Sequence, residues 1–221
     1  MAKQKTVGTV IRKKKWYPVM APRLFDYPIG ETSAFDSRSL VGRTLQINLM
    51  NLTDDPKRQN VNIKFLVTSS TDQVANAEPI GYVVMPSSLK RLMRRRTDKV
   101  DDSILCETAD GIRIRIKPFM LTRSIVKDSI KTHIRRVSRD YILKYAKKTT
   151  LVDLIRDIVS YKPQDELRNI LKKIYPLRTL EIRTLELAKD SKDERTIVEI
   201  VKAMGESKAE EQPQEQEAQA Q

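Results

Sequence analysis

The chain has 221 residues, of which 39% are hydrophobic, and a formal charge of +13. It is long enough for a packed core, and its charge exceeds what solubility requires, which points to a polyanionic partner: nucleic acid or an acidic membrane surface. The chain has a single cysteine, Cys106, and a single histidine, His133, which excludes a disulfide framework and a Cys/His zinc site. It contains no run of 18 apolar residues, so no transmembrane helix is predicted.

Residues 1–23 carry seven Lys or Arg side chains and no acidic residue. Pro18 and Pro22 disfavour a helix, so we expect an extended basic arm. In "KKKWYP", the rings of Trp16 and Tyr17 directly follow a run of cations. These rings could stack on an unpaired base or anchor the arm to the core, and the sequence leaves both interpretations open.

Residues 24–119 form a half in which strand patterns dominate. Alternating apolar residues predict strands at 42–52 and 61–69, and "IGYVVM" at 80–85 is a short β-branched run. These strands predict an antiparallel, partly closed sheet or barrel. A helix after Pro86, with Ser87 or Ser88 as N-cap, is predicted to end in three arginines, which favour a helix C-terminus.

The stretch "SILCETADGIRIRIKPFML" at 103–121 predicts a hairpin that turns at 109–111. In its return strand, Ile112, Ile114 and Ile116 alternate with Arg113, Arg115 and Lys117. The basic face could simply protect an edge strand from aggregation. We favour a phosphate-binding surface, because a basic helix follows.

That helix is predicted over 124–148, with an apolar stripe formed by Ile130, Ile134, Val137, Tyr141 and Tyr145. A row of cations runs beside the stripe at intervals of four residues: Lys127, Lys131, Arg135 and Arg139. Like charges at this spacing repel each other, so another part of the protein or a partner should offset this repulsion. The row is either a solvated basic face or a surface that follows phosphates over about 18 Å, and we favour the second interpretation.

The rest of the chain predicts two helices, one starting after Thr149 or Thr150 and one starting at Pro163. A strand is predicted at 175–188, and a short final helix ends at Gly205. Residues 206–221 are acidic and lack large apolar side chains, which predicts a disordered tail. We expect an α+β protein in which the β-rich half, 24–119, and the helix-rich half, 120–205, pack into one body.

No catalytic, cofactor or metal site is predicted. The six glycines are too scattered for a dinucleotide fingerprint or a phosphate-cradling loop, and the adjacent pairs at Asp54 and Asp101 do not resemble an acid/base dyad. His133 lies among cations with no carboxylate to orient it, so we expect it to face solvent or RNA. The cysteine usage and the lack of a secretory signal predict a cytosolic protein.

Four stretches resemble, in this order, the sequences of a known family: "KKKWYPVMAP", "TADGIRIR", "IRRVSRDYI" and "KIYPLRTLEIRTLELA". From Lys13 to Gly205 the chain resembles the archaeal and eukaryotic small-subunit ribosomal proteins of the S3Ae family, and its short arm resembles that of archaeal members. The resemblance implies a structural protein of the ribosomal platform. It also implies binding to the 3′ region of small-subunit rRNA near the mRNA exit, with platform proteins and mRNA as partners and no membrane.

We therefore predict a ribosome-associated, non-catalytic protein that binds rRNA through Lys and Arg contacts to phosphates. The alternatives are an rRNA-processing or modifying enzyme and a general DNA- or RNA-compacting basic protein. The residues expected to face RNA are Arg12, Lys13, Lys14, Lys15, Trp16, Tyr17, Arg94, Arg95, Arg96, Arg113, Arg115, Lys117, Lys127, Lys131, His133, Arg135, Arg136 and Arg139.

Overall fold

The computed structural model describes residues 13–21, 25–71 and 74–188. Its strands form one nine-stranded sheet. The main strand order is β2–β1–β5–β9–β8–β6, with β4 pairing β3 and β5, and β7 pairing β8. The strands are β1 (Lys15–Ala21), β2 (Phe25–Ala34), β3 (Thr44–Asn48), β4 (Val61–Ser70), β5 (Ala75–Val84), β6 (Lys99–Asp101), β7 (Ile104–Glu107), β8 (Arg113–Thr122) and β9 (Leu177–Leu187).

The predicted α+β class is confirmed, and the sheet stays open. Among the described strands, every pairing is antiparallel except a short parallel contact between β1 and β5, and none closes a barrel. The predicted strand at 175–188 is confirmed as β9, which lies between β5 and β8. A strand from the second half of the chain therefore joins the strands of the first half.

The segment predicted as an extended basic arm, residues 1–23, includes a strand of the sheet. Residues 15–21 form β1, which pairs with β2 and turns Tyr17 and Val19 into the core at 5% and 0% exposure. The sequence does not predict this strand, because lysines precede its alternating apolar residues and prolines lie among them. Pro18 is tolerated because only Val19 and Met20 pair with β5 on the other side of β1, so no ladder bond is lost there.

Two predicted boundaries in the first half are wrong. The strand predicted over 42–52 ends at Asn48, whose side chain accepts the N–H of Met50 (2.9 Å), and the short helix α1 (Met50–Thr53) follows. The next helix, α2 (Pro86–Leu92), has Met85 rather than a serine as N-cap, because Pro86 supplies its first turn. It ends before the three arginines, since Met93 is already extended.

The hairpin prediction is confirmed by β7 and β8. Gly111 adopts a φ of 72° in the turn, a conformation that glycine adopts without strain. Ile112, Ile114 and Ile116 are buried, while Arg113 and Arg115 are exposed. The alternation read from the sequence therefore separates an apolar face from a basic one.

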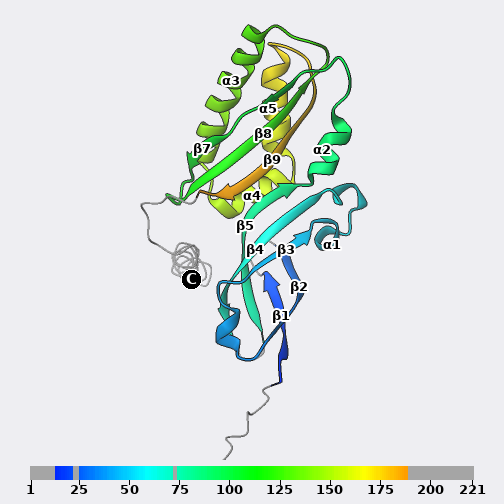
Figure 1. The fold of residues 1–221 in the computed structure, drawn as a ribbon. Helices are drawn as coiled ribbons and strands as arrows, with labels where there is room; N and C mark the ends of the chain where they lie inside the picture. Colours follow the sequence, from blue (N-terminus) through cyan, green and yellow to red (C-terminus); the bar gives the residue numbers. More distant parts are fainter. Residues whose placement is uncertain (1–12, 22–24, 72–73, 189–221) are drawn as a thin grey trace, which may run out of the picture.

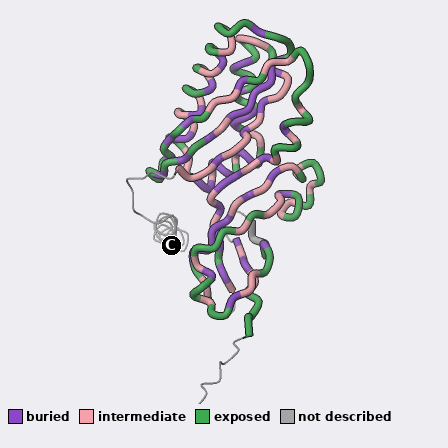
Figure 2. The backbone as a smooth tube through the Cα atoms, viewed as in Figure 1, coloured by how far each residue is buried: buried purple, intermediate pink, exposed green. Residues whose placement is uncertain are grey.

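Three helices cover one face of β7, β8 and β9 (Figure 1). They are α3 (Asp128–Ala146), α4 (Leu151–Val159) and α5 (Lys162–Lys172). Thr150 is confirmed as the N-cap of α4, since its side chain accepts the Asp153 N–H at 3.3 Å. Buried positions run along the strands and the facing sides of the helices (Figure 2). The final helix and the acidic tail predicted from the sequence lie outside the described residues.

Candidate nucleic-acid interface

The cation row of α3 borders the side of the helix that packs on the sheet. Ile134, Ser138 and Ile142 are buried, and each lies three residues after one of the cations in the row, on the same side of the helix. The phenols of Tyr141 and Tyr145 donate to Glu166 (2.6 Å) and Asp157 (2.8 Å), which ties α3 to α5 and α4. The predicted apolar stripe is thus the attachment of α3 to the body.

Lys131 is held by two carboxylates. Its Nζ lies 3.0 Å from Asp98 and 3.2 Å from Asp128, and only 22% of its side chain is exposed. The Val126 N–H donates to Asp98 (2.8 Å) and lowers the pKa of that carboxyl, and Lys131 lowers it further. Asp98, and then Asp128, raise the pKa of Lys131 in return. Lys131 is therefore a structural cation.

Arg139 meets a third carboxylate, that of Asp102. The two side chains lie 2.7 Å apart, with 53% of Arg139 and 13% of Asp102 exposed. Asp98 and Asp102 stand on either side of β6, so the two ends of this short strand neutralise two members of the row. These carboxylates offset the repulsion that the sequence predicts, and sequence reasoning missed them because they are remote in the chain.

Three other predicted contact cations on α3 or at its N-cap remain available to a partner. Lys127 and Arg136 are exposed and Arg135 is half-buried. Within the described residues, none of the three lies within ion-pair distance of a carboxylate. His133 is exposed beside them, which agrees with a solvent- or RNA-facing position and leaves it without a described carboxylate partner.

The cations of β8 face away from α3. Exposed side chains on this strand must point to the face that the helices leave uncovered, because alternate positions are buried beneath the helices. On that face Arg113 pairs with Glu107 (2.9 Å), and Arg115 lies opposite Glu186 on β9. Lys64 on β4 lies 2.8 Å from Glu186 and, ahead of the β8 cations, lowers the pKa of that carboxyl. The basic strand and the basic helix therefore form two separate surfaces.

Two further groups of predicted residues lie at loops and ends. Arg94, Arg95 and Arg96 are exposed between α2 and β6, where Arg96 has a left-handed φ of 64°. Lys13, Lys14 and Lys15 are exposed at the start of β1. Arg12 lies outside the described residues.

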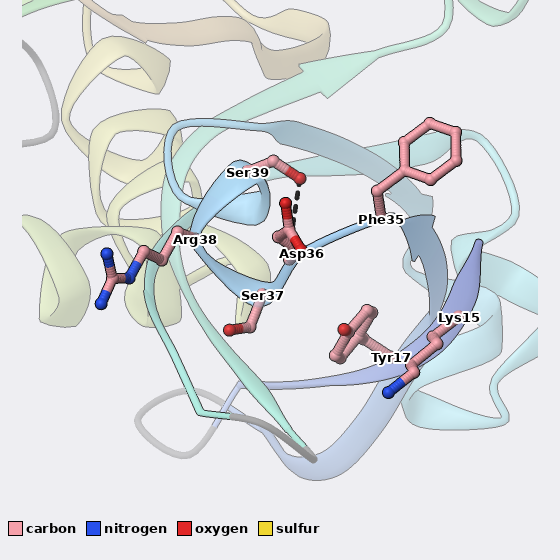
Figure 3. A pocket seen from close by; sticks show the side chains of 7 residues that line it. All are labelled: Lys15, Tyr17, Phe35, Asp36, Ser37, Arg38 and Ser39. Atoms are coloured by element: carbon pink, nitrogen blue, oxygen red, sulfur yellow. Dashed lines mark hydrogen bonds between the residues drawn. The ribbon is translucent and has the colours of Figure 1, made fainter. Parts of the chain in front are cut away.

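The two adjacent aromatic residues of β1 have different environments. Trp16 is 69% exposed, whereas Tyr17 is 5% exposed and belongs to the core. Tyr17 therefore anchors β1 to the core, whereas stacking of the exposed Trp16 on a base stays a prediction. Beside Tyr17 is an open hollow of about 830 Å³, lined by Lys15, Tyr17, Phe35, Asp36, Ser37, Arg38 and Ser39 (Figure 3).

Metal ligands and the one cysteine were the other groups to consider among the described residues. No three His, Cys, Asp or Glu side chains among them gather as a metal site requires. Burial raises the pKa of the Cys106 thiol to about 11, which disfavours the reactive thiolate. None of the described helices is long and apolar enough to cross a bilayer.

Comparison with known proteins gives one consistent result. The model of the ribosomal S3Ae family matches residues 2–191. Small ribosomal subunit protein eS1 of Methanothrix thermoacetophila is 33% identical over 79% of this chain and 83% of its own length. The eS1 proteins of Desulfurococcus amylolyticus (33%, over 80% of this chain and 83% of its own) and Archaeoglobus fulgidus (32%, over 92% and 100%) are similar to the same degree.

Proposed function

Because this chain belongs to the ribosomal S3Ae family, whose members are structural proteins of the small ribosomal subunit and not enzymes, we propose that it binds small-subunit rRNA through backbone phosphates. As a ribosomal protein it is associated with the ribosome in the cytoplasm. We place its binding site on the platform, at the 3′ region of the rRNA near the mRNA exit. Platform proteins and mRNA are the proposed neighbours.

The observation that carries this proposal is the uneven distribution of charge. Residues 113–150 contain twelve Lys or Arg and two acidic side chains, a net charge of +10. Such a surplus attracts the phosphate backbone and gains free energy by releasing its counterions. A folded RNA would be recognised through its shape and its phosphates, because side chains cannot read the bases of an A-form helix in its narrow groove.

The contact residues follow from which cations the fold leaves unneutralised. On α3 we propose Lys127, Arg135 and Arg136, with His133 beside them; Arg139 is partly neutralised but more than half exposed, and it joins them at the rim. Lys131 is excluded, because it holds α3 to the β6 region. On the other surfaces we propose Lys13, Lys14, Lys15, Arg94, Arg95, Arg96, Arg115 and Lys117, together with Arg113, which pairs with Glu107 but stays more than half exposed.

The test is a charge reversal on α3. We expect Arg135→Glu with Arg136→Glu to weaken binding to a small-subunit rRNA fragment at least about tenfold. The slope of log K against log salt should fall by about one for each lost phosphate contact. Filter binding or fluorescence anisotropy at four or more salt concentrations measures both quantities.

The matched control is Lys57→Glu with Lys90→Glu. These lysines are exposed, carry the same charge and make no ion pair with a described carboxylate, but they lie near α1 and on α2, away from α3. The control should lose much less affinity than the α3 variant. Equal losses would show that only total charge matters and would contradict the assignment of α3.

A further inference from the structure

The free end of the β1–β2 ribbon presents two aromatic side chains to solvent. Trp16 is 69% exposed and Phe35 is 48% exposed. Large aromatic side chains usually bury their area in the core or against a partner, so two such exposed rings on one ribbon need an explanation.

The register of the ribbon places both rings on its outer side. Lys15 pairs with Ala34 and Trp16 with Ser33. Tyr17 and Ala34 turn inward, at 5% and 1% exposure, so Trp16 turns outward. The Lys14 Nζ lies 5.5 Å from the centre of the Phe35 ring, and Phe35 points away from Tyr17 and Ser37 (Figure 3). We call Lys14, Trp16 and Phe35 the aromatic platform.

The aromatic platform of this chain is surrounded by basic side chains. Lys13, Lys14 and Lys15 are exposed, and no described carboxylate forms an ion pair with any of them. Arg38 is exposed across the neighbouring hollow, where Asp36 is the one acidic lining residue. The platform thus combines flat apolar faces with several positive charges at close range.

We propose that the aromatic platform binds an unpaired segment of RNA, with Trp16 and Phe35 stacking on bases and the adjacent lysines contacting the flanking phosphates. Base faces are accessible only where RNA is unpaired, and aromatic stacking combined with phosphate contacts is how single strands are bound without sequence preference. This inference rests on the proposed rRNA-binding function and adds a second mode of contact, distinct from the phosphate contacts of α3. A protein partner would be expected to offer carboxylates or an apolar pocket, and the lysines favour the polyanion instead.

Trp16 is the single tryptophan of the chain, so its fluorescence reports on the platform directly. Titration of the full chain with a twelve-nucleotide oligouridylate should quench this fluorescence to saturation, because stacking on a base quenches indole emission. A duplex RNA of the same total charge, at the same salt concentration, should bind with little quenching. Absent quenching by the single strand, or equal quenching by the duplex, would overturn the inference.

Substitutions then test the two rings by anisotropy with labelled oligouridylate. Trp16→Ala and Phe35→Ala should each raise Kd about fivefold or more, and Trp16→Phe should restore part of the affinity. The control is Ile170→Ala, since Ile170 is 39% exposed on α5, outside the proposed RNA-contact surfaces, and this variant should leave Kd unchanged. Trp16 and Phe35 are both exposed, and circular dichroism checks that the variants keep the wild-type fold.

The outcomes separate this inference from the proposed function. If the chain binds the rRNA fragment with salt dependence but oligouridylate neither quenches Trp16 nor responds to Phe35→Ala, the platform assignment alone is wrong. If Trp16→Ala weakens only the contact with another ribosomal protein, the aromatic platform is a protein-docking surface and the inference is overturned. If the chain binds no rRNA fragment at all, the proposed function itself fails.

Discussion

Asp98 joins three parts of the chain. Its carboxylate accepts the Val126 N–H ahead of α3 and pairs with Lys131 on α3. Its backbone N–H and carbonyl both meet the hydroxyl of Thr122 at the end of β8, at 3.0 and 3.1 Å. One residue before β6 therefore fixes where α3 begins relative to the sheet.

The lowered pKa of Asp98 predicts acid sensitivity. A carboxyl with a depressed folded-state pKa stabilises the fold above its unfolded pKa, and this contribution is lost as the pH falls through the folded value. Asp98→Asn should lower Tm at pH 7, and its deficit relative to wild type should shrink as the pH falls below about 4. Thermal unfolding between pH 7 and pH 3 measures this.

Asp140→Asn is the control for this prediction. Asp140 is exposed on α3 and makes no ion pair or hydrogen bond with another described side chain. Its Tm curve should follow that of wild type at every pH. Parallel curves for Asp98→Asn and wild type would instead show that the Asp98 charge contributes nothing to stability.

At the scale of elements, β5 and β9 approach closely at Gly81. A Cβ at this position would lie 2.9 Å from the carbonyl oxygen of Leu185, which is backbone and cannot turn aside. Gly81→Ala should therefore push the two strands apart and cost about 1–3 kcal/mol of unfolding free energy. Urea denaturation monitored by circular dichroism measures the loss.

Gly30→Ala provides the matched comparison in another strand. A Cβ there meets nothing within 4 Å, so the same substitution should change stability by less than about 0.5 kcal/mol. A similar loss in both variants would show that the cost comes from removing a strand glycine in general, not from the β5–β9 contact.

The elements that the sequence predicts well are those whose signal is local. The alternation of Ile112 to Lys117 and the cap at Thr150 are each confirmed by the structure. The wrong boundaries arise where a side chain competes with the expected pattern, as Asn48 does by accepting the Met50 N–H, or where tertiary pairing decides, as it does for β1. Neither effect can be read from a short window of sequence.

The candidate site divides in the same way. The surplus of cations around α3 is visible in the sequence, but its neutralisation is not: Arg139 and Asp102 are 37 residues apart in the chain. The separation of the strand cations from the helix cations likewise depends on which face α3 covers. The contrast between Trp16 and Tyr17 depends on the register of β1 with β2.

At the scale of the whole molecule, β9 links the N-terminal strands to the helical layer. It pairs with β5 on one side and β8 on the other, and α5 packs against it. Shared strands make separate unfolding of the two halves costly, because either half would expose an unpaired edge and part of the common core. We therefore propose that the β-rich and helix-rich halves form one body.

This arrangement predicts a single cooperative unfolding transition. In urea, loss of the helical signal of α3–α5 and loss of amide-exchange protection in β3 and β4 should share one midpoint. Opening of β3 and β4 at a clearly lower urea concentration would show instead that the halves are separately stable units.

The carboxylates on either side of β6 also bear on the entropy of association. By fixing Lys131 and Arg139, they hold α3 in place in the free protein, so Arg135 and Arg136, which we propose as RNA contacts, lie on a helix that is already ordered. Ordering long side chains and segments on binding costs free energy, and a preorganised surface avoids part of that cost. Asp98 and Asp102 thus neutralise Lys131 and Arg139, and the same two ion pairs make the helix that carries the remaining cations more rigid.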